Sequence, residues 1–176
     1  MKVVNLEKGT ASQLVITGGR SGSKKGFVSV LKYGLKVKEY LNVNFVSPIG
    51  AWCLKRSNTD RHHSFIVFTF SNRKTSCYLF ENNMLSHTNE LRLDESETSL
   101  HVNKLADGSI VQVTASKIRH IQNHHRDICI KGRIMKAVCL AEGRQLVILL
   151  IGGFMEYYEL NSNGELKLVS EFNLDS

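Results

Sequence analysis

Three continuous apolar stretches recur along this chain and restrict the folds it can adopt. They read FIVFTF (65–70), SIVQVT (109–114) and LVILLI (146–151), and they start 44 and 37 residues apart. Each is rich in β-branched or aromatic residues and too short for a typical helix, so each predicts a buried strand. A buried strand that returns after ~40 to 50 residues is typical of a β-propeller, in which four-stranded blades stand side by side.

Further strand candidates flank each of these runs. AWCLKR, SLHVNKL and KAVCLAEG precede them, and SCYLF, KIRHI and FMEYYEL follow them. The breaks are polar or glycine-containing, including Asp107-Gly108 and Glu142-Gly143, which is turn chemistry. A weaker fourth strand follows, clearest in ELKLVSEF, whose alternation is expected where only one face is covered. QLVIT, FVSVL and LKVKEYL, between residues 13 and 41, form a partial copy of the unit.

The sequence therefore predicts an all-β fold, a partial β-propeller of about three to four four-stranded antiparallel blades of non-WD type. We expect a single domain over 1–176, with a partial blade at 13–45 and blades at approximately 49–92, 98–131 and 134–172. Because propellers typically have four to eight blades, the chain is expected to be part of a larger ring, with an apolar blade face left bare. A small closed ring of four blades and a β-sandwich are the alternatives.

The composition fits a soluble intracellular domain. With 176 residues, 42% of them hydrophobic, the chain can bury a core. No apolar run approaches the ~20 residues needed to span a bilayer, and the N-terminus lacks the apolar core of a secretory signal. The four cysteines (Cys53, Cys77, Cys129 and Cys139) lie in apolar runs without C-x-x-C spacing, so we expect buried, reduced thiols.

Positive charge is concentrated in the first part of the chain. Residues 1–74 hold 13 Lys and Arg against 3 acids, whereas residues 75–176 hold 10 against 13. This asymmetry indicates an electrostatic partner, either RNA or DNA phosphates or an acidic protein face, with a solvated charged surface as the plainer alternative. Six residues form the candidate partner or nucleic-acid surface: Arg20, Lys24, Lys25, Lys55, Arg56 and Arg61.

Motifs for catalysis or cofactor binding are weak. GGRSGSKKG leads into a strand and lacks the Gly-Lys-Ser/Thr that opens a helix in a P-loop, so it predicts a basic hairpin tip. His62-His63 and His124-His125 are adjacent pairs that point to opposite faces of a strand, which favours loop surface histidines over a metal site. His120 is expected to pack or hydrogen-bond. No G-x-S-x-G occurs. We expect no enzyme activity, catalytic residue, cofactor, metal or small-molecule substrate, although a Ser–His–Asp set assembled in space stays open.

Four stretches, in order and at this spacing, resemble one protein family. They are GGRSGSKKGFVSVLKYGLKVKEY, AWCLKRSNTDRHHSFIVFTFSNRKTSCYLF, SIVQVTASKIRHIQ and LVILLIGGFMEYYELNSNGEL. The family contains the large propeller subunit of splicing factor 3b, the large subunit of the UV-damaged-DNA-binding complex and the largest subunit of the cleavage and polyadenylation specificity factor. KYGLKVKEY and IRHIQ favour the splicing member, and the match covers the opening blades of its middle propeller.

This resemblance implies a non-catalytic protein-interaction scaffold in the nucleus. The implied setting is pre-mRNA splicing, in the spliceosomal complex that recognises the branch site, with other subunits of a multi-subunit complex as partners, a further contact to RNA, and no membrane. The polar loop GRSGSKKG, the pair in DRHHSF and the absence of the first and third propellers depart from the family pattern. The alternatives are direct RNA or DNA binding through the basic N-terminal region, and a relative of the damaged-DNA-binding or polyadenylation factor.

Overall fold

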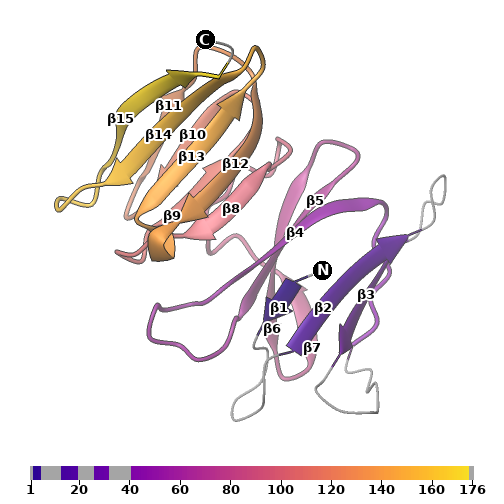
Figure 1. The fold of residues 1–176 in the computed structure, drawn as a ribbon. Coiled ribbons are helices and arrows are strands. Elements are labelled where there is room, and N and C mark those ends of the chain that lie inside the picture. Colours follow the sequence, from indigo (N-terminus) through magenta and orange to yellow (C-terminus); the bar gives the residue numbers. More distant parts are fainter. Residues whose placement is uncertain (1, 5–12, 20–25, 32–40, 175–176) are drawn as a thin grey trace. The chain divides into compact units, whose positions relative to one another are not determined.

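The computed structural model describes residues 2–4, 13–19, 26–31 and 41–174, which form strands and connecting turns (Figure 1). The one helical element among them is a single 3₁₀ turn, η1 (Ala141–Gly143). Across these ranges no helix has the length and apolar character to cross a bilayer. The chain divides into two compact units, residues 1–89 and 90–176.

The first unit contains two antiparallel sheets. Strands β1 (Lys2–Val4), β2 (Gln13–Gly19) and β3 (Gly26–Leu31) form a three-stranded sheet in sequence order. Strands β4 (Pro48–Leu54), β5 (Phe65–Phe70), β6 (Thr75–Glu81) and β7 (Met84–His87) form a four-stranded sheet, also in sequence order. The predicted strand LKVKEYL lies outside the described residues except for Leu41, which is in no strand.

The second unit contains two four-stranded antiparallel sheets. The first consists of β8 (His101–Lys104), β9 (Ile110–Val113), β10 (Lys117–Ile121) and β11 (His125–Cys129). The second consists of β12 (Ile134–Leu140), β13 (Gln145–Leu150), β14 (Phe154–Leu160) and β15 (Leu166–Asn173). Strands that follow each other in sequence pair in both sheets, and β11 and β15 are edge strands.

These sheets confirm the predicted fold class. The described residues contain three four-stranded antiparallel sheets, and each of the three apolar runs forms the second strand of its sheet, β5, β9 or β13. The flanking candidates form the strands on either side. The blade limits and the single domain given above stay predictions.

An aromatic cluster fills one face of the sheet β4–β7. The rings of Phe45 and Phe68 lie 4.8 Å apart between centroids, and Tyr78 meets Phe45 at 5.2 Å edge to face. Phe68 is fully buried, with Cys53 and Ile66 in the same cluster. The aromatic residues of FIVFTF therefore pack in a core, where such pairs contribute about 0.5–1.5 kcal/mol beyond the area they bury.

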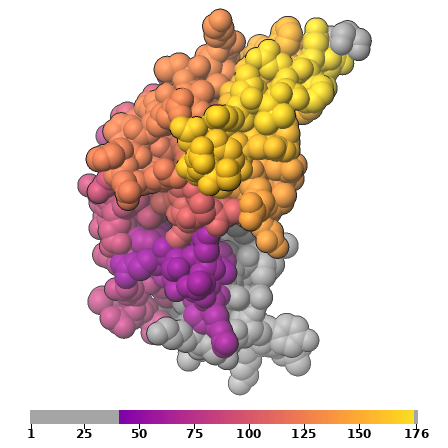
Figure 2. Space-filling model, turned by 90° about the vertical axis from the view of Figure 1, so that its left-hand side faces the viewer, coloured from indigo at the N-terminus to yellow at the C-terminus, as the bar shows by residue number. Residues whose placement is uncertain are grey.

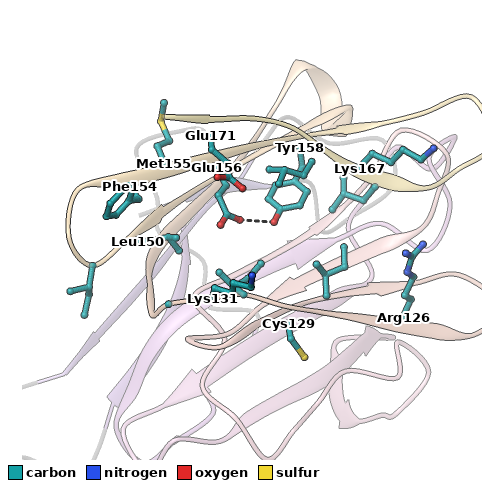
Figure 3. A pocket seen from close by; sticks show the side chains of 16 residues that line it. Arg126, Cys129, Lys131, Leu150, Phe154, Met155, Glu156, Tyr158, Lys167 and Glu171 are labelled. Atoms are coloured by element: carbon teal, nitrogen blue, oxygen red, sulfur yellow. Dashed lines mark hydrogen bonds between the residues drawn. The ribbon is translucent and has the colours of Figure 1, made fainter. Parts of the chain in front are cut away.

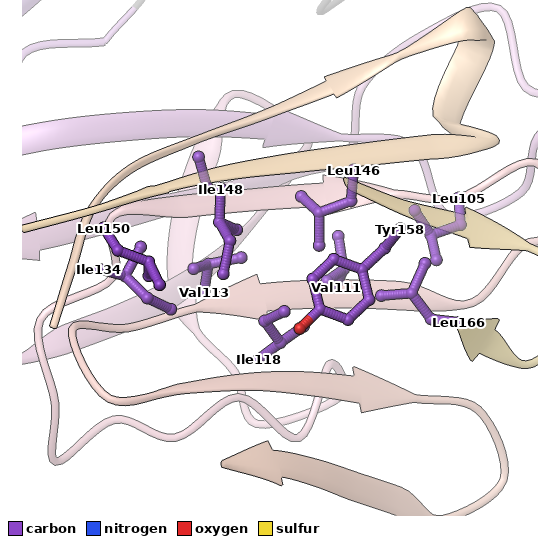
Figure 4. Packing of buried hydrophobic residues seen from close by; sticks show 11 residues of the cluster. Leu105, Val111, Val113, Ile118, Ile134, Leu146, Ile148, Leu150, Tyr158 and Leu166 are labelled. Atoms are coloured by element: carbon purple, nitrogen blue, oxygen red, sulfur yellow. The ribbon is translucent and has the colours of Figure 1, made fainter. Parts of the chain in front are cut away.

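The core of the second unit lies between its two sheets. Side chains of β13, Leu146, Ile148 and Leu150, point toward Val111 and Val113 of β9 (Figure 4). All five are buried, as are Ile118, Ile134, Tyr158 and Leu166 in the same cluster. Burying a branched aliphatic side chain stabilises the fold by about 1.5–3 kcal/mol, so this interface holds the two sheets together.

Strand β13 departs from the prediction that each apolar run forms a buried strand. Its burial alternates: Leu146, Ile148 and Leu150 are buried, whereas Val147 and Leu149 are only half-buried. By contrast, five consecutive residues of β5 are buried. Because neighbouring strand residues point to opposite faces, the alternation means that one face of the sheet β12–β15 has no covering layer among the described residues.

A turn glycine anchors the two sheets of the second unit to each other. Gly143 has φ +87°, and a Cβ added there would lie 2.8 Å from the Lys104 carbonyl oxygen. Its own carbonyl accepts a hydrogen bond from the Ala106 backbone N–H at 3.3 Å. The predicted Glu142-Gly143 turn therefore needs glycine both for its backbone conformation and for close approach.

The cysteine expectation is corrected at one position. All four cysteines are free, and Cys53 and Cys77 are buried in the sheet β4–β7. Cys139 is half-buried, and burial raises the pKa of its thiol to about 11, with a smaller opposing effect from a hydrogen bond to Asn103. Cys129 is exposed, because it ends the edge strand β11, where an apolar sequence neighbourhood does not ensure cover.

Candidate interaction surfaces

The six basic candidate residues are divided by what the structure describes. Arg20, Lys24 and Lys25 lie outside the described residues. Lys55, Arg56 and Arg61 lie in the loop between β4 and β5. The predicted strand AWCLKR therefore ends before its two basic residues, at Leu54. Arg56 is exposed, but its guanidinium lies 3.3 Å from a carboxylate oxygen of Glu81 and 5.6 Å from the centre of the Phe65 ring. The positive charge of Arg56 is therefore partly compensated, and the basic surface stays a prediction.

The histidine pairs occupy different settings. His62 and His63 lie half-buried in the β4–β5 loop, and the Nδ1 atom of His62 is buried without a hydrogen-bond partner. His124 is exposed in the β10–β11 turn, while His125 is exposed but opens strand β11 rather than lying in a loop. Among the described residues, no cluster of three histidine, cysteine or carboxylate side chains could hold a metal ion.

Serine, histidine and aspartate do meet in space, but not in the order that catalysis requires. Ser109 Oγ lies 2.6 Å from Asp107 Oδ1 and 2.8 Å from His120 Nε2. Burial lowers the pKa of His120, Asp107 opposes this, and Arg126 adds to it, so the ring is neutral near pH 7. Because the carboxylate is the stronger acceptor, Ser109 donates to Asp107 and the histidine Nε2–H donates to Ser109.

This arrangement has a positioning role. In a hydrolase triad the carboxylate orients the histidine, which accepts the serine proton. Here the carboxylate binds the serine directly, and Asp107 Oδ1 also accepts from the Ser109 backbone N–H at 3.0 Å. The cluster thus fixes the turn between β8 and β9 and ties it to β10, which matches the expectation that His120 hydrogen-bonds.

A compact ion network covers the other face of the sheet β8–β11. Lys117 Nζ lies 2.8 Å from Asp94 Oδ2 and 3.2 Å from Glu97 Oε1, and Arg119 pairs with both oxygens of Asp127 at 2.8 and 2.9 Å. Burial raises the pKa of Asp94, but hydrogen bonds from Lys117 and Ser96 outweigh it and hold the value at about 2. This face is therefore polar, charged and internally paired.

A buried glutamine secures the segment that carries those acids. Gln112, fully buried in β9, accepts the Asp94 backbone N–H at 2.7 Å and donates to the Asp94 carbonyl and to Ser99 Oγ, both at 2.9 Å. The side chain thus replaces strand pairing for the connection leading into β8. Sequence reasoning missed this role. The one signal for it was that Gln112 is a polar residue inside the apolar run SIVQVT.

The face of β12–β15 turned away from the core exposes apolar side chains, next to the polar Lys136, Gln145 and Glu159 in the cross-strand register. We call it the open face and define it by Val138, Leu140, Val147, Leu149, Met155, Tyr157 and Phe172. Cross-strand register places Val138, Val147 and Tyr157 in one row and Leu149, Met155 and Phe172 in another. The exposed fraction is 42% for Val138, 46% for Leu140 and 47% for Phe172. Exposed apolar surface of this kind makes the open face a candidate interaction site.

A groove with a volume of about 740 Å³ lies on the opposite side, between β11 and the outer strands β14 and β15 (Figure 3). Leu150, Tyr158 and Leu166 form its buried floor, and Phe154 and Leu168 are exposed along it. Its charged residues are Arg126, Lys131, Glu156, Lys167 and Glu171. Tyr158 Oη donates to Glu156 Oε2 at 2.6 Å, and burial is the main cause of the raised pKa of this tyrosine.

Curated proteins similar to this chain include splicing factors and a spliceosome-associated protein. The chain is 27% identical over 176 residues to the pre-mRNA-splicing factor RSE1 of Pyricularia oryzae, 27% over 173 residues to splicing factor 3B subunit 3 of Drosophila melanogaster, and 25% over 177 residues to the spliceosome-associated protein 130 A of Arabidopsis thaliana. These matches cover 94%, 97% and 99% of the chain, respectively. The chain spans about 14% of the length of each relative.

Solved structures support the fold alone. A Lactobacillus plantarum protein, a structural genomics target, superposes with a TM-score of 0.65 at 7% identity, covering 97% of this chain and 55% of that one. The Cps50 (Swd1) β-propeller domain of Myceliophteria thermophila superposes with a TM-score of 0.59 at 12% identity, covering 85% and 55%. Residues 38–175 match the family described as the RSE1/DDB1/CPSF1 second β-propeller. With its successive four-stranded sheets and this match over most of its length, the chain belongs to the RSE1/DDB1/CPSF1 second β-propeller family and forms a fragment of such a propeller.

Proposed function

We propose that the chain is a segment of a non-catalytic protein-interaction scaffold, a subunit of the nuclear complex that recognises the branch site of pre-mRNA. Its similarity to proteins named as splicing factors from fungi, insects and plants supports the splicing role over the damaged-DNA and polyadenylation alternatives. The Asp107–Ser109–His120 arrangement, in which the serine is held rather than activated, supports a structural role.

The open face is the observation that carries this proposal. Several large apolar side chains on four adjacent strands remain in contact with water, although the same chain buries comparable residues elsewhere. Covering such a surface gains about 25 cal/mol per Å² of apolar area removed from water. A protein partner from the same assembly that supplies an apolar sheet face would gain this free energy on binding.

Affinity precipitation from nuclear extract tests the proposal. The tagged full chain is expected to enrich spliceosomal proteins, quantified by mass spectrometry. The double variant Val147→Glu/Leu149→Glu should reduce that enrichment by about tenfold or more, because it places two carboxylates in the contact, where charge is excluded.

Met84→Glu is the matched control, since Met84 is equally apolar and is 67% exposed on another sheet. It should leave enrichment within about twofold, and circular dichroism should show that all variants remain folded. Equal enrichment of spliceosomal proteins by the wild type and the double variant would contradict the proposal.

Direct RNA binding through the basic region predicts a different result. A labelled single strand should then bind with an affinity that falls steeply with salt and is lost when Lys24, Lys25, Arg56 and Arg61 are all changed to Glu. The Arg56–Glu81 pair weakens this alternative, because a paired guanidinium offers less charge to phosphate. Binding that survives the fourfold change would exclude it.

A further inference from the structure

The loop between β4 and β5 presents hydroxyl side chains to solvent beside arginines. Arg56, Ser57, Thr59 and Arg61 are all exposed. The purple residues that include this loop form part of the surface on the face shown in Figure 2. Loops that rigid strands hold at both ends commonly carry functional residues. The hydroxyl groups of this loop are therefore within reach of another protein in solution.

A tight turn places Thr59 at the tip of this loop. The Asp60 backbone N–H donates to the Ser57 carbonyl at 3.1 Å, and the Ser57 N–H donates to Asp60 Oδ2 at 2.7 Å. The hydroxyl oxygens of Ser57 and Thr59 lie 2.9 Å apart. Hydrogen bonds between exposed groups contribute little net stability, because water replaces them when they break. The turn can therefore open locally into an extended conformation without unfolding the sheet.

The charges around Thr59 match the pattern that arginine-directed protein kinases select. Arg56 precedes Thr59 by three residues, and Arg61 follows it by two. Kinases of this class bind such cations with carboxylates of their own, which fixes the register of the substrate against the catalytic site. Arg56 lies 3.3 Å from Glu81, but both side chains are about half exposed. An exposed ion pair of this kind is weak, so Arg56 can exchange Glu81 for a carboxylate of a kinase.

Exposure separates Thr59 from the other hydroxyl groups that follow an arginine at the same distance. Among the described residues these are Ser64 and Ser76. Both are half-buried, Ser64 with its backbone N–H bonded to the last residue of β4 and Ser76 paired with β5 inside the sheet. Ser23 has the same spacing and lies outside the described residues. Of the described hydroxyl groups with this spacing, only that of Thr59 lies on an exposed residue.

We propose that Thr59 is a phosphorylation site for a kinase that selects arginine three residues before and two residues after the acceptor. The catalytic aspartate of the kinase accepts the Thr59 hydroxyl proton while Oγ1 bonds to the γ-phosphorus of Mg²⁺-bound ATP. The bond from that phosphorus to the bridging oxygen breaks, and ADP leaves. Thr59 belongs to the first unit and the open face to the second, so this inference goes beyond the scaffold proposal and does not rest on it.

Phosphorylation would cancel the positive charge of the loop. Residues 55–64 carry three cations (Lys55, Arg56 and Arg61) and one carboxylate (Asp60), so their net charge is +2 with neutral histidines. A phosphate on threonine adds about −1.5 to −2 at pH 7. Its oxygens accept paired hydrogen bonds from a guanidinium, which makes it a stronger partner for Arg56 than Glu81 is. The modification would therefore switch off the attraction of this loop for anionic partners.

Phosphorylation of the folded full chain in vitro tests the proposal. The catalytic domain of protein kinase C, which selects this arginine spacing, is added with Mg²⁺ and ATP, and mass spectrometry of protease fragments locates and quantifies the phosphate. We expect phosphate on Thr59, and Arg56→Gln should slow its incorporation about tenfold or more, because one charge-assisted contact to the kinase is lost. Arg73→Gln makes the same change in the exposed β5–β6 turn and should leave the rate at Thr59 within about twofold.

The peptide Leu-Lys-Arg-Ser-Asn-Thr-Asp-Arg-His-His separates recognition from accessibility, since it has the sequence of the loop without the fold. Its kcat/KM should lie within about tenfold of that of the folded chain. Phosphate on the peptide but not on Thr59 of the folded chain overturns the proposal, as does phosphate on neither. Phosphate on Ser57 in place of Thr59, or equal rates for the wild type and Arg56→Gln, also overturns it. None of these outcomes alters the enrichment expected from the open face, so the two proposals fail separately.

Discussion

The two sheets of the second unit have nearly the same architecture, but corresponding faces meet different environments. In β8–β11 the side chains of Val111, Val113 and Ile118 are completely buried against the next sheet. In β12–β15 the side chains on the corresponding face, including Val147 and Leu149, are only half-buried. The residue types are alike, so the difference comes from the presence or absence of a neighbouring sheet.

The two sheets also differ on the faces that they turn away from their shared core. The face of β8–β11 away from the shared core carries Gln112, Lys117, Arg119 and Asp127, all held in hydrogen bonds or ion pairs. The face of β12–β15 away from that core is mainly apolar and has no comparable network among the described residues. One sheet thus covers this face with its own paired polar side chains, while the other leaves apolar side chains exposed.

Introducing a charge should give the largest difference in stability loss between the two sheets. Val111→Lys places an ammonium group in the fully buried interface, and we expect a loss of about 3–5 kcal/mol of unfolding free energy because the charge has no partner there. Val147→Lys, at the corresponding half-buried position, should cost less than about 1 kcal/mol. Urea unfolding of the full chain, followed by circular dichroism, measures both. Equal losses would show that the open face is covered in solution.

Removing apolar atoms should give the next largest contrast. Ile148→Ala leaves a cavity between the sheets and should cost about 2–5 kcal/mol, because Ile148 is fully buried in the cluster. Leu149→Ala, one residue on, removes a half-buried side chain from the open face and should cost about 1 kcal/mol. The same unfolding titration compares them, and a reversed order would contradict the assignment of faces.

The hydrogen bonds of Gln112 in β8–β11 should contribute somewhat less to the unfolding free energy. Gln112→Ala leaves the Asp94 N–H and carbonyl and the Ser99 hydroxyl without their buried partner, so we expect a loss of about 1–3 kcal/mol. Gln145→Ala, in the second strand of the other sheet, should change stability by less than about 0.5 kcal/mol. Hydrogen exchange should report faster exchange of the Asp94 amide in the Gln112 variant and no change there in the Gln145 variant.

Acid should lower the unfolding free energy through the ion network of β8–β11. The pKa of Asp94 is about 2 in the folded chain against an ordinary value of 3.8, so the unfolded state takes up protons first. The stabilisation by Asp94 is fully present above pH ~4 and is lost between pH ~4 and 2. It amounts to about 1–2 kcal/mol. The side chain is 14% exposed, so solvent screening reduces the value.

His120 adds a second loss of stability on acidification, at higher pH than the loss from Asp94. Burial lowers its pKa below the ordinary 6.5, so the unfolded state binds the proton more readily and stability declines as the pH falls below about 6.5. Unfolding free energies measured from pH 7 to 2 should show both steps in the wild type. Asp94→Asn should reduce the step below pH ~4 without removing it, because the pKa values of Asp107 and Asp127 are lowered as well, and it should leave the earlier step unchanged. An unchanged slope below pH ~4 would contradict the role given to Asp94.

Local sequence pattern predicted the strands well, because their signals are local. The three apolar runs, the alternation of ELKLVSEF and the turns at Gly108 and Gly143, both with positive φ, identify strands and their ends without reference to distant residues. The pairing of Ser109 with Asp107 also follows from a spacing of two residues in a turn.

The interaction surfaces were less accessible to sequence reasoning, because their residues come together only through register and packing. Glu156 and Glu171 face each other because β15 pairs with β14 through an irregular register next to Tyr157, which no local pattern reveals. Asp94 reaches Lys117 across 23 residues and Asp127 joins them from the edge strand. The basic set, chosen by composition, includes one arginine that Glu81 compensates from a neighbouring strand.

The amino-acid sequence by itself determined the period of the strands, the second-strand position of the apolar runs and the family. These depend on residue type and spacing, which act through backbone preference and burial. Only the tertiary structure decided which apolar face is covered, which carboxylates stand opposite each other, and where a groove opens between edge strands. A side chain's environment is set by the sheet packed against it, and faces with similar apolar residues differ when only one of them has that neighbour.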